Sequence, residues 1–151
     1  MATWKDKNGK EWNCEITIKT LKQIKQRLGI DLLEPQENIK KLIADKYLLC
    51  DVIYLAHEDA CKQQNITDED FGGLLVGDAI DCATKALIDS LICFFPIQQR
   101  QMLEKITKKR EQVTAAIYQK IGNEIENLPI DKVMEELQKL LGKESTNLQE
   151  Q

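Results

Sequence analysis

The segment from Asp78 to Phe95 constrains the fold most, because side chains of different size recur along it at helical spacing. Small side chains repeat at intervals of four, three and four residues, at Ala79, Ala83, Ala86 and Ser90. Bulky apolar side chains form an adjacent stripe, at Ile80, Leu87, Leu91 and Phe94. A helix with one small and one bulky stripe is suited to packing closely against other helices. The sequence therefore predicts a buried helix here, which Pro96 ends.

Glycines precede this helix. Gly72 and Gly77 are separated by four residues, as are the two glycines of the phosphate-binding motif GxxxxGK[ST]. That motif requires Lys and then Ser or Thr after its second glycine, but this chain has Asp78 and Ala79, and an aspartate repels phosphate. A calcium loop beginning at Asp68 fails as well, because its twelfth position lacks the necessary glutamate. We therefore interpret the glycines as sites of bending or close packing, with a break between two helices at Gly77.

Caps and apolar periodicity predict the remaining elements. Asn8-Gly9 favours a tight turn, which gives an N-terminal hairpin over residues 1–17. Helices are predicted at Thr17 to Gly29, Asn38 to Ala44 with Pro35 at its start, Asp45 to Gln63, Asp68 to Val76, Ile97 to Leu128 and Asp131 to Gly142. In the last helix we expect the apolar side chains to face inward, at Val133, Leu137, Leu140 and Leu141.

These elements predict the fold class and the domain organisation. We expect a mainly α protein, a compact bundle of about five to six helices with an N-terminal β-hairpin. The 151 residues are a usual length for one domain, which we place at residues 1–142. Residues 143–151 are polar, and we expect them to form a flexible tail.

Cysteine usage and apolar runs bear on the cellular compartment. The five cysteines are an odd number and contain no CxxC pair, which is typical of reduced thiols. We expect at least four of them in or near the core, out of Cys14, Cys50, Cys61, Cys82 and Cys93. No apolar run approaches the ~20 residues that cross a bilayer, and the first residues lack the apolar stretch of a signal peptide. We therefore expect a cytoplasmic protein with no membrane partner.

The charge is distributed unevenly along the chain. Residues 47–96 contain two basic and nine acidic residues, and such a segment repels phosphate groups. The one dense basic run is Lys108-Lys109-Arg110, and no aromatic residue is interleaved with it. We interpret this run as a solvated helix face, so nucleic acid is not an expected partner.

Candidate catalytic or metal-binding residues are few. His57 is the single histidine, and Cys50, His57 and Cys61 share one helical face. Cys50 and Cys61 lie about 16 Å apart along a helix, so one zinc ion cannot bind both. The neighbouring Glu58-Asp59 pair is interpreted as a solvated face and not as an acid–base pair. We therefore expect no enzyme activity, no cofactor and no metal.

A set of residues over about residues 3–105 resembles a known family. The set comprises Trp4 and Trp12 around the hairpin, Leu21, Leu28 to Leu33, Asp45 to Tyr54, Thr67 to Gly72, Leu75 to Ile80, Ala83, Ala86-Leu87 and Phe94 to Pro96. In this order the residues resemble small proteins encoded among the tail genes of long-tailed bacteriophages and prophages, of the tail assembly chaperone kind. Residues 106–151 take no part in the resemblance.

The resemblance implies a role and a set of partners. Tail assembly chaperones coat the tape measure protein, a very long and largely helical chain, and keep it soluble until tail tube subunits enclose it. The implied partners are the tape measure protein, further copies of this chain and, as an additional candidate, the tail tube protein, all in the bacterial host cytoplasm. The main alternative is a structural virion protein, such as a head–tail connector or tail-completion subunit. An enzyme or metal protein and a host regulatory adaptor also remain open.

Four large aromatic residues are the candidate partner contacts: Trp4, Trp12, Phe94 and Phe95. Large aromatic side chains are enriched among the residues that dominate binding at protein interfaces. The alternative interpretation places all four side chains in the core, because aromatic area is usually buried.

Overall fold

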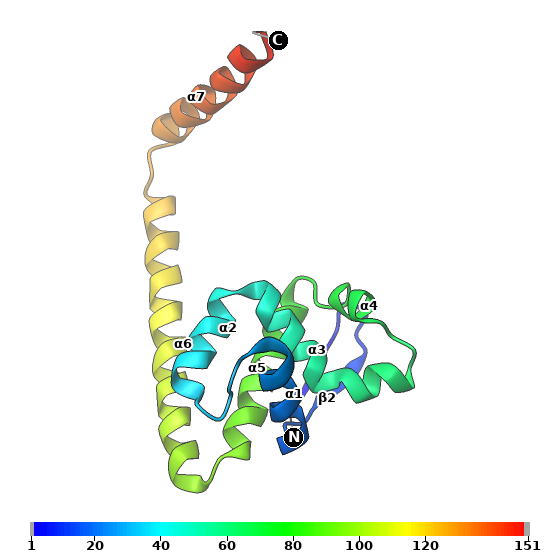
Figure 1. The fold of residues 1–151 in the computed structure, drawn as a ribbon. Coiled ribbons are helices and arrows are strands. Elements are labelled where there is room, and N and C mark those ends of the chain that lie inside the picture. The colour runs from blue at the N-terminus through cyan, green and yellow to red at the C-terminus, as the bar shows by residue number, and fades with distance from the viewer. Residues whose placement is uncertain (1, 150–151) are drawn as a thin grey trace. The chain divides into compact units, whose positions relative to one another are not determined.

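A computed structural model describes the backbone of residues 2–149 and the side chains of residues 2–142. The chain is 74% helical. Its described part contains seven helices and one two-stranded antiparallel sheet (Figure 1). This confirms the predicted mainly α fold with an N-terminal β-hairpin. Two compact units make up the chain, Met1–Glu104 and Lys105–Gln151, and the single domain expected over residues 1–142 stays a prediction.

The hairpin opens the first unit. Strand β1 (Ala2–Lys5) pairs with β2 (Glu11–Cys14), and the register places Trp4 opposite Trp12. In the connecting loop Gly9 has a φ of 81°, whereas Asn8 is not in the positive-φ region. The loop is wider than a two-residue Asn-Gly turn, because the Asp6 carboxylate accepts hydrogen bonds from the backbone N–H groups of Asn8 and Lys10.

Three helices follow the hairpin: α1 (Ile18–Leu28), α2 (Pro35–Ala44) and α3 (Lys46–Gln63). The Thr17 side chain accepts from the backbone N–H of Thr20 at the start of α1, and Gly29 ends that helix with a φ of 70°. The Asp45 carboxylate caps α3 by accepting from two backbone N–H groups of its first turn. These helix ends agree with the caps predicted from the sequence.

The glycine-containing segment forms a short helix, a break and a long helix. Helix α4 (Asp68–Gly72) begins with a reciprocal capping box between Thr67 and Asp70. It ends before the predicted Val76, because the Leu74 carbonyl accepts from the backbone N–H of Lys7 and ties the chain to the hairpin loop. Gly77, with a φ of 63°, precedes helix α5 (Asp78–Phe94).

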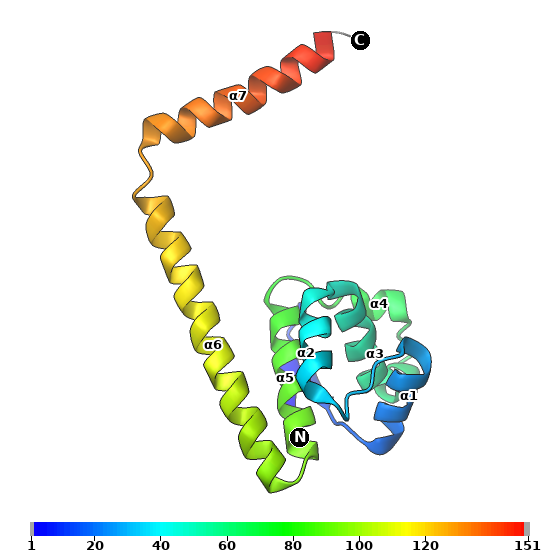
Figure 2. The ribbon, with the colours of Figure 1, turned by 60° about the vertical axis from the view of Figure 1, so that its left-hand side comes forward.

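Helix α5 packs mainly against the hairpin and against α3 (Figure 2). Its small-residue stripe is buried as predicted, at Ala79, Ala83, Ala86 and Ser90. The expected neighbours were other helices, whereas β1 makes the most extensive contact with α5. The Ser90 hydroxyl donates to the backbone carbonyl of Cys14 in β2 at 2.7 Å. Because the side chains of this stripe are small, the β-hairpin can pack closely against α5.

The cysteines are less buried than predicted. Cys14 and Cys61 are buried, and Cys50 is half-buried. Cys82 and Cys93 are exposed, so the expectation of at least four core or near-core thiols is wrong. Cys82 lies between the buried Ala79 and Ala83 positions of α5 but on its polar side, which the helical period turns away from the hairpin.

Helices α6 (Ile97–Glu126) and α7 (Ile130–Gln149) complete the described chain. The buried Leu103 belongs to the first unit, and the part of α6 from Lys105 onward belongs to the second unit with α7. The predicted helix end at Gly142 is wrong, because α7 continues to Gln149. One glycine costs a helix only about 1 kcal/mol, and the residues after it include the good helix formers Lys143 and Glu144. The flexibility expected of residues 143–151 stays a prediction.

Candidate interaction surfaces

An aromatic cluster lies beneath the hairpin and holds it against the helices. The rings of Trp4 and Trp12 stack with centroids 6.0 Å apart. Both rings also meet the buried Phe71 side chain of α4 edge to face, at 6.0 Å and 5.3 Å. Such pairs contribute roughly 0.5–1.5 kcal/mol beyond their buried area. The two-stranded hairpin, marginal in isolation, is therefore anchored by its own tryptophans.

His57 of α3 completes the cluster and is 2% exposed. Its Nε2 accepts a hydrogen bond from the Trp4 indole N–H at 3.0 Å, and its Nδ1 lies 2.7 Å from the Ile53 carbonyl. An acceptor Nε2 and a donor Nδ1 define one neutral tautomer of the imidazole. Burial lowers the pKa of His57, although the hydrogen bond to Ile53 opposes this effect. The histidine is therefore a neutral member of the core.

The second tryptophan is tied to the hairpin loop. The Trp12 indole N–H donates to the Asp6 carboxylate at 2.9 Å, and Asp6 is buried. Burial alone raises the pKa of Asp6, but hydrogen bonds from Trp12 and from the backbone N–H groups of Asn8 and Lys10 outweigh it and lower the pKa. A buried carboxylate with three donors stays ionised and fixes the loop conformation.

The structure places three of the four candidate partner contacts in the core of the chain. Trp4 and Trp12 are each 3% exposed, and Phe95 is 6% exposed. Phe94 is half-buried against the same core, and its ring meets Phe95 edge to face at 5.7 Å. Trp4, Trp12 and Phe95 therefore follow the alternative interpretation from the sequence, and Phe94 follows it in part. A role for these four residues in binding stays a prediction.

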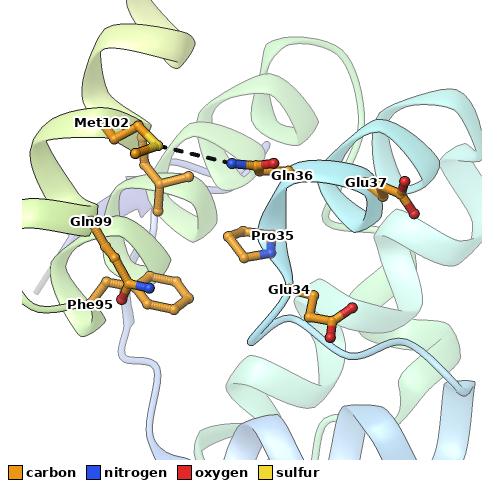
Figure 3. Close-up of a pocket in the computed structure, with 8 residues that line it drawn as sticks. Glu34, Pro35, Gln36, Glu37, Phe95, Gln99 and Met102 are labelled. Atoms are coloured by element: carbon orange, nitrogen blue, oxygen red, sulfur yellow. Dashed lines mark hydrogen bonds between the residues drawn. The ribbon is translucent and has the colours of Figure 1, made fainter.

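A cavity of about 440 Å³ opens beside Phe95 (Figure 3). It lies between the N-terminal turn of α2 and the beginning of α6, and its residues are Glu34, Pro35, Gln36, Glu37, Phe95, Gln99, Met102 and Leu103. The Gln36 side-chain amide donates to the Met102 sulfur at 4.0 Å across one side of it. Phe95, Met102 and Leu103 give the cavity apolar side chains, whereas the carboxylates of Glu34 and Glu37 point away from Phe95 and Met102 in Figure 3.

His57 and Cys61, two residues of the helical face considered for metal binding, are both buried. Both ring nitrogens of His57 have protein partners, and burial raises the pKa of the Cys61 thiol to about 11. At neutral pH this thiol is therefore almost entirely protonated, whereas the thiolate is the reactive form. Within residues 2–142, no group of three or more His, Cys, Asp or Glu side chains could hold a metal ion.

The prediction that Glu58 lies on a solvated face is wrong. Glu58 is 5% exposed, and its carboxylate accepts from Arg27 of α1 at 2.9 Å and lies 3.2 Å from the Lys62 ammonium. The adjacent Asp59 is exposed and pairs with Lys19, as expected of a solvated residue. The helical period separates the two neighbours by 100°, so one carboxylate points between α1 and α3 while the other points to solvent.

Helix α7 carries an exposed apolar face. Leu141, which the sequence also predicts to face inward, is 62% exposed. Five further large side chains are between 40% and 78% exposed, at Ile130, Val133, Met134, Leu137 and Leu140. The prediction that this face points inward is wrong, because α6, the other described helix of the second unit, makes no contact with α7. We call these five residues the α7 face. Exposed apolar side chains gathered on one helix mark an interaction site more often than a structural accident.

Helix α6 carries a second apolar face beyond the first unit. Ile106, Val113, Ile117 and Ile121 are 46–53% exposed and recur at spacings of seven, four and four residues. We call these four residues the α6 face. The sequence showed this stripe, but apolar periodicity does not reveal whether a stripe is covered by the same chain. The predicted basic run is exposed on the same helix, as expected.

Comparisons with known proteins assign no function to these surfaces. No family model, curated protein or solved structure matches this chain. None of the described helices is both long enough and apolar enough to cross a membrane.

Proposed function

We propose that this chain is a phage tail assembly chaperone, which binds the tape measure protein through apolar helix contacts and keeps it soluble while the tail tube assembles. The proposal places the chain in the cytoplasm of a bacterial host and includes self-association of its copies along the tape measure protein. It is supported by the residue pattern between Trp4 and Pro96 and by one structural observation, the exposed α7 face.

The α7 face has the geometry that a helical partner requires. Ile130, Met134 and Leu137 follow each other at spacings of four and three residues and share one side of the helix. A partner helix with a matching apolar stripe packs against such a side by ridges into grooves. A tape measure protein that is not yet enclosed presents stripes of this kind repeatedly, and it aggregates if they remain exposed.

The contact is also of the reversible kind that a chaperone needs. The α7 face offers five side chains, and burying each contributes roughly 1.5–3 kcal/mol before the costs of association. One such contact is weak, but many copies on one long chain are held together by their combined binding. Each copy can then leave individually as a tube subunit takes its place.

Co-expression with a tape measure fragment tests the proposal. The wild-type chain is expected to raise the soluble fraction of the fragment and to co-purify with it. Leu137→Asp places a charge in the centre of the α7 face, and we expect it to abolish both effects. Gln138→Asp introduces the same charge on the neighbouring residue, about 100° around the helix, and should behave like the wild type.

The proposal fails if the fragment stays insoluble with the wild-type chain, or if Leu137→Asp and Gln138→Asp bind it equally well. Circular dichroism of both variants must show equal helix content, so that a loss of binding reports the contact. The structural virion protein remains the alternative function. Mass spectrometry of purified particles separates the two, because a chaperone is absent from mature virions whereas a connector or completion protein is present.

A further inference from the structure

The charges beside the α6 face are sorted along the helix. Arg110 lies near the middle of α6 and Glu124 near its end, and both are exposed. At 100° per residue, both positions fall within the arc of about 80° that the α6 face occupies. Neither residue forms an ion pair with another described residue. They are 14 residues apart, which is about 21 Å along the helix, so they cannot meet within one chain.

The pattern is symmetric about Ile117. Arg110 precedes Ile117 by seven residues and Glu124 follows it by seven. Val113 precedes it by four residues and Ile121 follows it by four. When such a helix is laid antiparallel on its own copy, Arg110 meets Glu124 and Val113 meets Ile121. A two-fold symmetric contact requires this self-complementarity, because the same surface serves both partners.

We propose that two copies of the chain pair antiparallel through the α6 face. Ile117 meets the partner's Ile117 on the two-fold axis, Val113 packs against the partner's Ile121, and Arg110 pairs with the partner's Glu124. The symmetry repeats the last two contacts on the other side of the axis. Lys120, at the edge of the face, lies opposite the partner's Thr114 and meets no like charge.

The opposite orientation is disfavoured by the same residues. In a parallel pair, Arg110 meets the partner's Arg110 and Glu124 meets the partner's Glu124, so both contacts repel. The proposed pairing deepens the self-association in the proposed function but does not depend on the tape measure protein, because the chain alone tests it. It also leaves the α7 face out of the contact, so the two surfaces are tested by separate variants.

Sedimentation equilibrium of the full chain tests the pairing. At micromolar concentration we expect a dimer, with twice the 17.4 kDa mass of the chain. Salt should weaken dimerisation, because it screens exposed ion pairs. Ile117→Asp brings two negative charges together on the axis, and we expect a monomer. Tyr118→Asp is the matched control, because this residue is 72% exposed and points about 100° away from Ile117, and the dimer should persist.

Ile117→Ala distinguishes the loss of the contact from the loss of the helix. Alanine is the better helix former, so weaker dimerisation in this variant comes from the lost contact and not from a melted helix. A monomeric wild-type chain, or an unchanged dimer in both Ile117 variants, overturns the proposal.

A charge reversal tests the antiparallel register. Arg110→Glu alone and Glu124→Arg alone each create two repulsive contacts, and we expect either to weaken dimerisation about tenfold. The double variant Arg110→Glu/Glu124→Arg restores opposite charges at both contacts, so its dimer should match the wild type. A double variant no tighter than the two single ones contradicts the register.

Discussion

The indole N–H of Trp4 donates a hydrogen bond to Nε2 of His57, 53 positions further along the chain, at 3.0 Å. The bond joins the first strand to the central helix α3 inside the aromatic cluster. It exists only while the imidazole is neutral, because a protonated ring has no acceptor nitrogen. Protonation of His57 therefore breaks this bond, so the attachment of the hairpin depends on pH.

The first prediction is a loss of stability in mildly acidic solution. Burial lowers the pKa of His57 below its ordinary value of 6.5, so the unfolded chain binds the proton more readily than the folded chain. The free energy of unfolding is therefore highest above pH 6.5 and falls as the pH drops below it, by at most about 1.4 kcal/mol per pH unit for one proton. Urea unfolding at a series of pH values measures this slope.

His57→Gln is the control for this prediction. Glutamine keeps an acceptor for Trp4 but does not titrate, so the slope between pH 6.5 and pH 5 should flatten. The carboxylates with lowered pKa contribute at lower pH, which leaves this window to the histidine. Equal slopes in the two proteins mean that His57 does not carry the effect.

The second prediction concerns the bond between Trp12 and Asp6. Trp12→Phe keeps an aromatic ring but removes the N–H that Asp6 accepts from. A hydrogen bond to a charged group contributes about 1.5–3 kcal/mol, so the variant should lose stability by this order at pH 7. Chemical denaturation of the variant and the wild type gives the difference in free energy.

The pH dependence identifies the origin of that loss. The lowered pKa of Asp6 means that its stabilisation is complete above pH 3.8 and is lost as the pH falls through the folded pKa. The gap between wild type and Trp12→Phe should therefore narrow in acid. A gap that is constant with pH would indicate lost packing and not a lost charged hydrogen bond.

The sequence predicted local structure well and long-range contacts poorly. Thr17 and Asp45 were identified as caps because their partners lie within three residues. The small stripe of α5 was found by its period, but its contact with the hairpin was not, because Ser90 and Cys14 are 76 positions apart. No local rule links a hydroxyl to a carbonyl at such separation.

The same holds for the candidate surfaces: the sequence shows which side of a helix is apolar, but not what that side contacts. The spacing of apolar residues in the sequence reveals the stripe on α6 and the apolar side of α7. Periodicity states that one side of a helix is apolar, but the chain must supply a second element before that side is buried. For Trp4 and Trp12 the sequence leaves core and interface open, because a large aromatic residue serves in either place, and the structure places both side chains in the core.

The third prediction concerns the buried carboxylate of Glu58. Hydrogen bonding from Arg27, together with Lys62, lowers the pKa of Glu58 despite its burial. Arg27→Ala leaves that carboxylate with a single cation, so it should destabilise the chain more than Lys19→Ala, which breaks an ion pair exposed on both sides. Thermal unfolding at pH 7 ranks the two variants, and an equal loss contradicts the prediction.

Acid should remove the difference between those variants. The stabilisation from Glu58 is present above pH 4.5, the ordinary value, and disappears as the pH falls through its lowered pKa. Arg27→Ala and the wild type should therefore converge at low pH. A gap of unchanged size there would assign the effect to the packing of the arginine stem.

The fourth prediction tests why α5 carries small residues on one side. Ala83 is fully buried, whereas the adjacent Cys82 is exposed. Ala83→Leu inserts three carbon atoms into the contact between α5 and the rest of the first unit, and overpacking of this kind costs about 1–3 kcal/mol. Cys82→Leu adds a similar volume to the exposed side and should change the free energy of unfolding by less than about 0.5 kcal/mol. Denaturant unfolding compares them, and a well-tolerated leucine at position 83 would mean that the close approach of α5 does not depend on side-chain size.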